Sequence, residues 1–346
     1  MQFFAPQEMV TQKDIAQRLG VSASLVSRAL GGTAPGIGAA ATTIERIRVE
    51  AAKLKYQPNA VALSLRGTST RTIGVVIKNF DDPFFGRVIA ELQALATAKQ
   101  FSLLLTGCPP GAEARVDIHS MEKHRLDGLI ITGSDFVPEG LKSFLSRDVK
   151  VVRLGFGPVT PGVINVTVDL ESGLRQLVSY LTKLGHRDIG YIGDETAPNL
   201  RREKLLLAAL KKASLLARPN CFVRAKTTGA DAGYEAMQIL LKRCGDLLPT
   251  AVVAAEDVLA QTALRVLFER RVRVPQDLTL VGVDDVPSAR MTIPALTTLR
   301  QPIPAMVQIA FEQLITTGEK SQRTILVKPE LVIRESSAAK TENGNG

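Results

Sequence analysis

The feature that most constrains this chain is a regular alternation of short apolar runs with helical segments beyond about residue 72. Runs of strand length, rich in β-branched residues, include TIGVVIK, FSLLLTG, DGLIITG, VKVVRLG and VINVTVD, and the rhythm resumes with DIGYIGD, CFVRAK, TAVVAAED and LTLVGVDD. Segments such as FFGRVIAELQALATAKQ lie between these runs and have helical periodicity. The alternation predicts parallel sheets covered by helices on both faces, in two similar halves.

The N-terminal stretch TQKDIAQRLGVSASLVSRALGG has a different pattern, two short helices on either side of a glycine. Thr11 is a good N-cap for a helix over residues 12 to 19, and Ser22 can cap a second helix over residues 23 to 30. Gly20 can take the left-handed backbone that ends the first helix. These signals predict a helical hairpin with a tight turn.

The spacing of Ala16, Gly20 and Val26 in this hairpin is that of a helix-turn-helix. The small Ala16 lets the two helices approach each other, and Val26 fills the angle between them. The outward face of the second helix carries short side chains and one arginine, which suit a helix in a DNA major groove: Ala23, Ser24, Ser27 and Arg28. The alternative is an ordinary helical hairpin whose polar face meets only water.

The distribution of charge favours nucleic acid as the partner of this front segment. The chain of 346 residues has a formal net charge of +9, and residues 1 to 71 hold nine Lys/Arg against four Asp/Glu. A small part of the chain thus carries more than half of the positive excess, as neutralisation of DNA phosphates requires. Basic faces without such a role are also common, so the charge supports the motif and does not replace it.

The stretch DIAQRLGVSASLVSRAL, continued by AAKLKYQPNAVALSLR, resembles the lactose repressor (LacI) family of bacterial transcription regulators. The resemblance implies a third helix, a Tyr-x-Pro-Asn turn and a short hinge helix over residues 60 to 65. In that family the hinge helices of a dimer enter the minor groove, where a leucine at the position of Leu65 wedges between base pairs. The residues expected to contact DNA are Thr11, Ser22, Ala23, Ser24, Ser27, Arg28, Tyr56, Asn59, Ala62 and Leu65.

Two features depart from the family pattern in this region. Leu25 stands where the family usually has threonine, which removes a hydroxyl that could contact a phosphate. The connection GGTAPGIGAAATT before the third helix is longer than usual, is rich in Gly and Ala, and lacks the usual serine cap.

The resemblance continues through GLIITG, VDLESG, LTKLGHRDIGYIG and VGVDDVPSARMTIPALTTLRQP, and it covers the chain to about Glu335. It implies the fold of the periplasmic sugar-binding proteins, two α/β subdomains joined by three crossings near Asp169, Ala295 and Lys328. The expected fold class is therefore a small all-α helix-turn-helix domain plus a two-subdomain, periplasmic-binding-protein-like α/β domain with parallel sheets flanked by helices. The expected parts are a DNA-binding domain with its hinge helix (1–66), a linker (67–72), an effector-binding and dimerisation domain (73–337) and a disordered polar tail (338–346).

A small-molecule effector is expected between the subdomains, because open α/β sheets bind ligands beyond the carboxyl ends of their strands. Each polar residue at a strand end could instead cap the following helix. These residues are Asn79, Asp81, Ser134, Asp194, Asp257, Asp284 and Asp285. The resemblance selects among the candidates, since the family's cleft arginine falls on Arg202, and Glu256 and Asp257 stand where the family has Asn-Asp.

Aromatic rings are the other expected component of the effector site. The chain has no Trp, so a sugar ring would stack on a phenylalanine, with Phe84 preferred over Phe80 and Phe85. The alternative is that these rings are core or dimer contacts. The residues expected to bind the effector are Phe84, Phe85, Ser134, Arg202 and Asp257.

The sequence shows no constellation that enzymatic chemistry would need. Asp284 and Asp285 are adjacent at a strand end and more often shape a turn, the three histidines lack metal-ligand spacing, and no GxSxG, Walker A or GxGxxG motif is present. Cys108, Cys221 and Cys244 are widely spaced without a CxxC pair, which favours isolated thiols over a disulfide framework or a zinc site. Neither a cofactor nor a metal is expected.

Taken together, these patterns predict a homodimeric repressor that binds a palindromic DNA operator and is controlled by a sugar or sugar derivative, or by a nucleobase-type effector. The alternative is a sugar-binding protein without a regulatory role. MQFFAPQEMV does not resemble a secretory signal, and no apolar run approaches the length of a membrane span, so a cytoplasmic, nucleoid-associated protein is expected. The tail SSAAKTENGNG lacks the leucine heptads of a tetramerising helix.

Overall fold

The computed structural model describes residues 10–30, 39–56, 69–107, 118–133, 138–316 and 323–340. The chain divides into two units, Met1–Thr70 and Arg71–Gly346. The expected hinge helix over residues 60 to 65 lies outside the described residues. The expected linker ends earlier than predicted, because Thr72 already belongs to the first strand.

Three helices build the described part of the N-terminal unit: α1 (Gln12–Leu19), α2 (Ala23–Leu30) and α3 (Ala41–Lys53). At the start of α1, the Thr11 hydroxyl and backbone N–H donate to the Asp14 carboxylate at 2.8 and 2.7 Å, within a capping box. Gly20 ends the helix at φ 64°. The core between the helices is formed by Ile15, Ala16, Val26, Ala29, Ile47 and Ala51. Ala16 and Val26 therefore lie at the helix contact that their spacing predicts.

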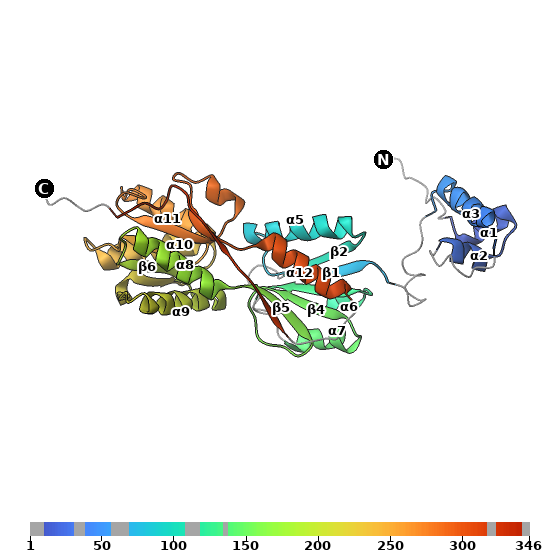
Figure 1. Ribbon diagram of the computed structural model, residues 1–346, viewed down its shortest axis with the longest axis horizontal. Helices are drawn as coiled ribbons and strands as arrows, with labels where there is room; N and C mark the ends of the chain where they lie inside the picture. The colour runs from blue at the N-terminus through green and yellow to red at the C-terminus, as the bar shows by residue number, and fades with distance from the viewer. Residues whose placement is uncertain are drawn as a thin grey trace, which may run out of the picture. The chain divides into compact units, whose positions relative to one another are not determined.

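The second unit contains two sheets. The strands of the first are β1 (Thr72–Ile77), β2 (Ser102–Gly107), β3 (Gly128–Thr132), β4 (Lys150–Leu154), β5 (Val163–Val168) and β11 (Thr324–Val327). They lie in the order β11-β5-β4-β3-β1-β2, and every pair is parallel. Two helices, α5 (Pro83–Ala98) and α12 (Ile303–Ile315), pack together on one face, and the shorter α6 (His119–Glu122) and α7 (Lys142–Ser146) lie on the other (Figure 1).

The strands of the second sheet are β6 (Ile189–Asp194), β7 (Phe222–Ala225), β8 (Ala251–Ala254), β9 (Thr279–Asp284), β10 (Thr297–Arg300) and β12 (Glu330–Val332). Their order is β12-β10-β9-β8-β6-β7, and β12 runs antiparallel to β10 at the edge. The helices that cover this sheet pack in two pairs: α8 (Leu170–Lys183) with α9 (Ala197–Lys212), and α10 (Ala230–Cys244) with α11 (Asp257–Glu269). The two sheets with their helices are the two predicted halves.

The chain crosses three times between the two subdomains, as the resemblance implies. The first crossing is at Asp169, between β5 and α8, and the third is at Lys328 and Pro329, between β11 and β12. The second lies at Gln301 and Pro302, between β10 and α12, so the prediction of a crossing near Ala295 is wrong. The short strand TTLR adds four more residues to the second sheet before the chain leaves it.

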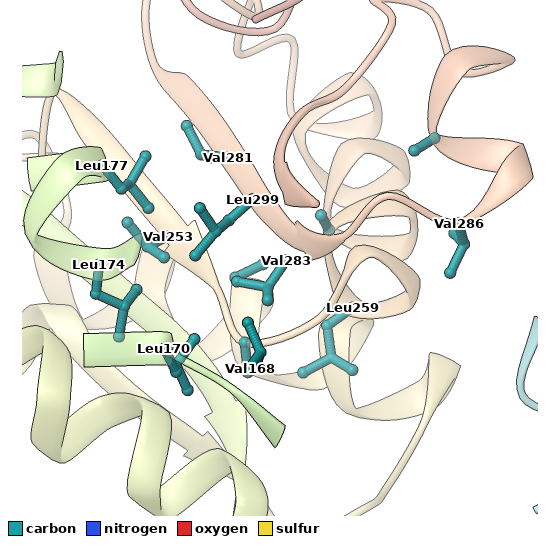
Figure 2. Packing of buried hydrophobic residues seen from close by; sticks show 14 of the residues in the cluster. Val168, Leu170, Leu174, Leu177, Val253, Leu259, Val281, Val283, Val286 and Leu299 are labelled. Carbon is teal, nitrogen blue, oxygen red and sulfur yellow. The ribbon is translucent and has the colours of Figure 1, made fainter. Parts of the chain in front are cut away.

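The core of the second subdomain explains why the sequences of its strands are almost continuously apolar. Leu170, Leu174 and Leu177 recur along one side of α8 at helical spacing, and Figure 2 shows them facing the side chains of the sheet, among them Val281 and Leu299. These side chains are almost fully buried. Burial on both faces gives the near-continuous hydrophobic strands of a parallel sheet.

The prediction of a disordered tail over residues 338–346 is wrong for the first of these residues. The backbone N–H of Ala338 donates to the Thr279 hydroxyl at 3.3 Å, and that of Lys340 donates to the Leu184 carbonyl at 2.8 Å. His186 Nε2 lies 2.9 Å from the Ala338 carbonyl. Hydrogen bonds to the backbone of this segment keep it ordered although its side chains are small and polar. Residues 341–346 lie outside the described residues.

Within the described ranges, none of the helices has both the length and the apolar character that crossing a membrane would require.

Candidate functional site

The exposed face of α2 is the first candidate site. Val26 and Ala29 point into the helical core, which leaves Ala23, Ser24 and Arg28 exposed on the other side of the helix. The Ser22 hydroxyl accepts from the backbone N–H of Leu25 at 3.2 Å and so caps α2, as predicted. The helix thus presents short side chains and one guanidinium to the surroundings.

Some residues expected to contact DNA have structural partners in the N-terminal unit. The Thr11 hydroxyl already donates to Asp14, and hydrogen bonds from Thr11 hold the pKa of the Asp14 carboxyl below its usual value. Tyr56 is half-buried against the helical core, and so is Leu25, the residue that stands where the family usually has threonine. Three further expected contacts lie outside the described residues: Asn59, Ala62 and Leu65.

A cavity of about 520 Å³ between the two subdomains is the second candidate site. The polar and aromatic side chains that the first subdomain contributes to its lining are Lys78, Asn79, Asp81, Asp82, Phe84, Phe85, Phe156 and Thr167. Those of the second subdomain are Asp194, Thr196, Arg201, Arg202, Glu256, Asp284 and Gln301, with Thr228 just before α10. The lining comes mostly from the carboxyl ends of the strands, as the fold class predicts.

Arg202 is the centre of a charged network in this cavity. Its guanidinium donates to Glu256 Oε1 and Asn199 Oδ1, each at 2.7 Å, and reaches Asp284 Oδ1 at 3.5 Å. Gln301 Nε2 also donates to Asp284 Oδ1, at 2.6 Å. Burial opposes the charge of Arg202, but Asp284 and Glu256 more than offset it and raise the pKa of the guanidinium. The charged form of Arg202 is therefore fixed in place.

Burial has the opposite consequence for Asp284, a residue that is only 5% exposed. Burial raises its pKa well above the ordinary value, although the charge of Arg202 works against that rise. Asp284 and Asp285 both have positive φ, 120° and 58°, so the pair shapes a turn as predicted. Arg300 and Arg334 bind the Asp285 carboxylate at 2.7 and 2.6 Å, behind the cavity.

Asp194 is a second fixed carboxylate in the lining. Its Oδ1 accepts from the Thr196 backbone N–H at 2.9 Å, the Thr196 hydroxyl at 2.5 Å and Asn199 Nδ2 at 2.8 Å. The same Asn199 bonds Arg202 through its other side-chain atom. The networks of Asp194 and Arg202 are thus joined.

The structure corrects the prediction for Asp257. This residue is fully buried, does not line the cavity, and accepts from the Thr298 hydroxyl at 2.6 Å and the Val286 backbone N–H at 2.9 Å. Burial raises the pKa of its carboxyl to about 7. The preceding residue, Glu256, is the one whose side chain lines the cavity, because Asp257 opens α11 and turns toward the protein interior.

The other expected effector residues divide between the cavity and the core. Phe84 and Arg202 line the cavity. Phe85 contributes to the lining but is 7% exposed, and its ring packs edge-on against Phe84 with centroids 5.2 Å apart, so it is mainly a core residue. Ser134 lies outside the described residues.

Sequence reasoning missed several residues of the lining, among them Asp82, Phe156 and Arg201. Asp82 caps α5 by accepting from the Phe84 N–H at 2.9 Å, a role that the Asp-Pro signature before a helix would have indicated. Phe156 and Arg201 form a pair in which the guanidinium carbon lies 4.2 Å from the ring centroid. No local signal joins those two residues, because they come from different subdomains.

In the part of the chain that the structure describes, no group of three or more His, Cys, Asp or Glu side chains is arranged to hold a metal ion.

Fold and sites together define a helix-turn-helix protein with a two-subdomain ligand-binding module. Residues 178–337 match the family model of the periplasmic binding protein-like domain. The chain is 33% identical over 340 residues to the HTH-type transcriptional repressor PurR of Erwinia tasmaniensis, covering 95% of this chain and 97% of that protein. It is 32% identical to PurR of Pectobacterium carotovorum, with the same two coverages.

Among solved structures, the lac repressor dimer bound to operator and the anti-inducer ONPF aligns with a TM-score of 0.80 and 25% identity, covering 96% of this chain and all of that one. The chain belongs to the LacI family of transcription regulators. It is a DNA-binding transcriptional repressor of the effector-controlled class, and not an enzyme.

Proposed function

We propose that the protein binds a palindromic operator as a homodimer and that a small molecule in the cavity changes its affinity for DNA. The observation that carries the proposal is the exposed face of α2, on which Ala23, Ser24 and Arg28 stand free of the helical core. A two-fold dimer reads two half-sites, one with each copy of this helix. The alignment over 96% of the chain with a repressor dimer bound to operator supports this arrangement.

The roles of the DNA contacts follow from side-chain chemistry. Ala23, Ser24 and Arg28 read or approach base edges in the major groove, where an arginine can bond guanine with two donors. The residues that contact the DNA backbone or complete the interface are Thr11, Ser22, Ser27, Tyr56, Asn59 and Ala62. Leu65 of each copy wedges into the central minor groove and bends the operator.

The effector occupies the cavity, held by Arg202, Glu256 and Asp284 on one side and by Phe84 on the other. Because both subdomains line the cavity, a ligand that contacts both favours one degree of closure over another. The protein then acts in the cytoplasm, at the nucleoid, where its operator lies.

The DNA-binding part is tested by selection of genomic fragments. Purified full-length protein is mixed with sheared DNA at moderate salt, and the retained fragments are sequenced. We expect a shared palindrome with a flexible central step. Fragments without a common motif would contradict the proposal.

Arg28 provides the matched variant. Arg28→Ala should weaken binding to the selected operator about ten- to a hundredfold and relax the preference at one base position, because a bidentate arginine contact carries discrimination. Arg48→Ala removes one exposed positive charge from α3 of the same unit and serves as control. This variant should weaken binding to all DNA sequences alike. Equal loss of base preference in both variants would show that α2 is not the reading helix.

A further inference from the structure

The charges that line the cavity do not balance. Five carboxylates line it: Asp81, Asp82, Asp194, Glu256 and Asp284. Three cations face them: Lys78, Arg201 and Arg202. Arg202 is engaged with Glu256 at 2.7 Å and with Asp284 at 3.5 Å, and the guanidinium of Arg201 lies over the ring of Phe156. With all of these groups ionised, an anionic ligand would enter a site with a formal surplus of negative charge, and the raised pKa values of Asp82 and Asp284 reduce that surplus.

Two of these carboxylates belong to largely buried residues, and each has one oxygen that accepts no hydrogen bond from the described residues. Asp194 is 3% exposed, and its three donors all bond Oδ1. Asp284 is 5% exposed, and both Arg202 and Gln301 reach its Oδ1. The Oδ2 atoms of both residues accept no hydrogen bond from the described residues. Neither Oδ2 atom is fully buried, since among the described residues the only fully buried side-chain N and O atoms without a partner belong to Arg153, so hydroxyl groups of a ligand in the cavity can donate to both Oδ2 atoms.

Two further carboxylates belong to opposite walls of the cavity. Asp82 is on the first subdomain, where its Oδ1 accepts from Phe84 N–H, and Glu256 is on the second, where Oε1 accepts from Arg202. Burial raises the pKa of Asp82, and the charge of Glu256 adds to the rise although the Phe84 hydrogen bond opposes it. Two like charges that face one cavity favour a cation between them.

We propose that the effector is a small polyhydroxylated molecule that carries a protonated amine, of the amino-sugar type, and that the amine binds between Asp82 and Glu256. The hydroxyl groups donate to the unsatisfied oxygens of Asp194 and Asp284. An amine that bonds one carboxylate from each subdomain also draws the two walls together, which ties recognition to closure. This inference rests on the proposed function of the cavity.

A panel of matched ligands tests the charge of the effector. Sets of three molecules on common hexose and pentose scaffolds, such as glucosamine, glucose and glucuronate, are titrated into the full-length protein by calorimetry and by thermal shift. We expect the amine of a set to bind and to raise the Tm more than the neutral or acidic member. Preference for a neutral or acidic member would overturn the amine assignment and leave the cavity as the effector site. Binding by no member would overturn the polyhydroxylated, amine-bearing effector proposed here, while the proposed function, control of DNA binding by a small molecule in the cavity, would stand.

Asp82→Asn separates charge from structure, because asparagine is an equally good N-cap for α5. The variant should weaken the amine about ten- to a hundredfold and leave its neutral counterpart nearly unchanged, since a hydrogen bond to a charged group is lost. Glu256→Gln should give the same selective loss without touching the cap. Asp246→Asn, which removes an exposed carboxylate elsewhere in the second subdomain, should bind like the natural protein. Equal weakening of amine and neutral ligand in both cavity variants would overturn the proposal.

Discussion

The two walls of the cavity differ in how firmly their side chains are held. On the second-subdomain wall, Arg202 joins Glu256 and Asp284 through hydrogen bonds, and Asn199 links this group to Asp194. On the first-subdomain wall, Asn79, Asp81 and Phe156 are exposed, and the Asn79 side chain accepts only a local bond from the Asp81 N–H at 2.9 Å. The side chains of the second-subdomain wall are therefore preorganised before a ligand binds, while those of the first-subdomain wall retain rotamer freedom.

This difference assigns different tasks to the walls. A connected buried network has fixed geometry and lowers the entropy cost of ligand binding, so the second wall sets the position of the effector. The exposed side chains of the first wall lose freedom only when the ligand is bound, so their contacts contribute mainly to closure. Substitutions on the second wall should therefore affect both folding and binding, whereas those on the first should affect binding alone.

The largest expected effect comes from removing the centre of the second wall. Arg202→Met leaves the buried Asp284 and the half-buried Glu256 carboxylates without their cation, so the free energy of unfolding should fall by about 3–5 kcal/mol. Urea denaturation measures the loss, and effector-induced thermal stabilisation should disappear with it. Arg201→Met is the matched control, with a loss below about 1 kcal/mol because no carboxylate among the described residues forms an ion pair with this arginine. Equal losses in the two variants would remove the distinction between the neighbouring arginines.

A smaller effect is expected from Asp257, which lies behind the second wall. Its folded pKa of about 7 exceeds the unfolded value of 3.8 because of burial, so the folded chain holds a proton that the unfolded chain releases between these values. The stability from this group is present below about pH 4 and is lost as the pH rises through about 7.

Urea denaturation at pH 5 and pH 7 measures this dependence. The Asp257 carboxyl should make the natural protein about 1–3 kcal/mol less stable at the higher pH, and Asp257→Asn should lack that part of the difference. The same pH dependence in protein and variant would mean that the carboxyl titrates as an ordinary aspartate.

The smallest expected effect on stability belongs to the first wall. Phe156→Leu removes an exposed ring, so the free energy of unfolding should change by less than about 0.5 kcal/mol. Affinity for the effector should still fall about three- to tenfold, because ring contacts with a ligand or with Arg201 are lost. Calorimetry with an amino sugar and urea denaturation give the two values. A stability loss as large as that of Arg202→Met would show that the first wall is also prebuilt.

The helix-turn-helix could be predicted from the sequence residue by residue, because its determinants are local. Thr11 and Asp14 cap α1 from three residues apart, and Gly20 takes the one backbone conformation that the turn needs. The spacing of Ala16 and Val26 is read directly along the chain. No distant segment decides any of these features.

The cavity could be predicted only in part, because side-chain direction there depends on long-range packing. The strand-end residues Asp194 and Asp284 and the helix residue Arg202 line the cavity, whereas Asp257 does not and Glu256 lies there in its place. A difference of one position determines which carboxylate faces the cavity. Asp257 is the first residue of α11, and there its side chain points toward Thr298, 41 residues away in the sequence. The bonds of Ala338 and Lys340 to distant backbone are a second case of this kind.

The central claim is that a ligand in the cavity controls the affinity of α2 for its operator. The most direct test is fluorescence anisotropy with the selected operator and the natural full-length protein, with and without a saturating amino sugar that raises the Tm. The account predicts a change in operator affinity of about fivefold or more, the usual range of coupling between two sites. Equal operator affinity in the ligand-free and ligand-saturated protein would contradict it.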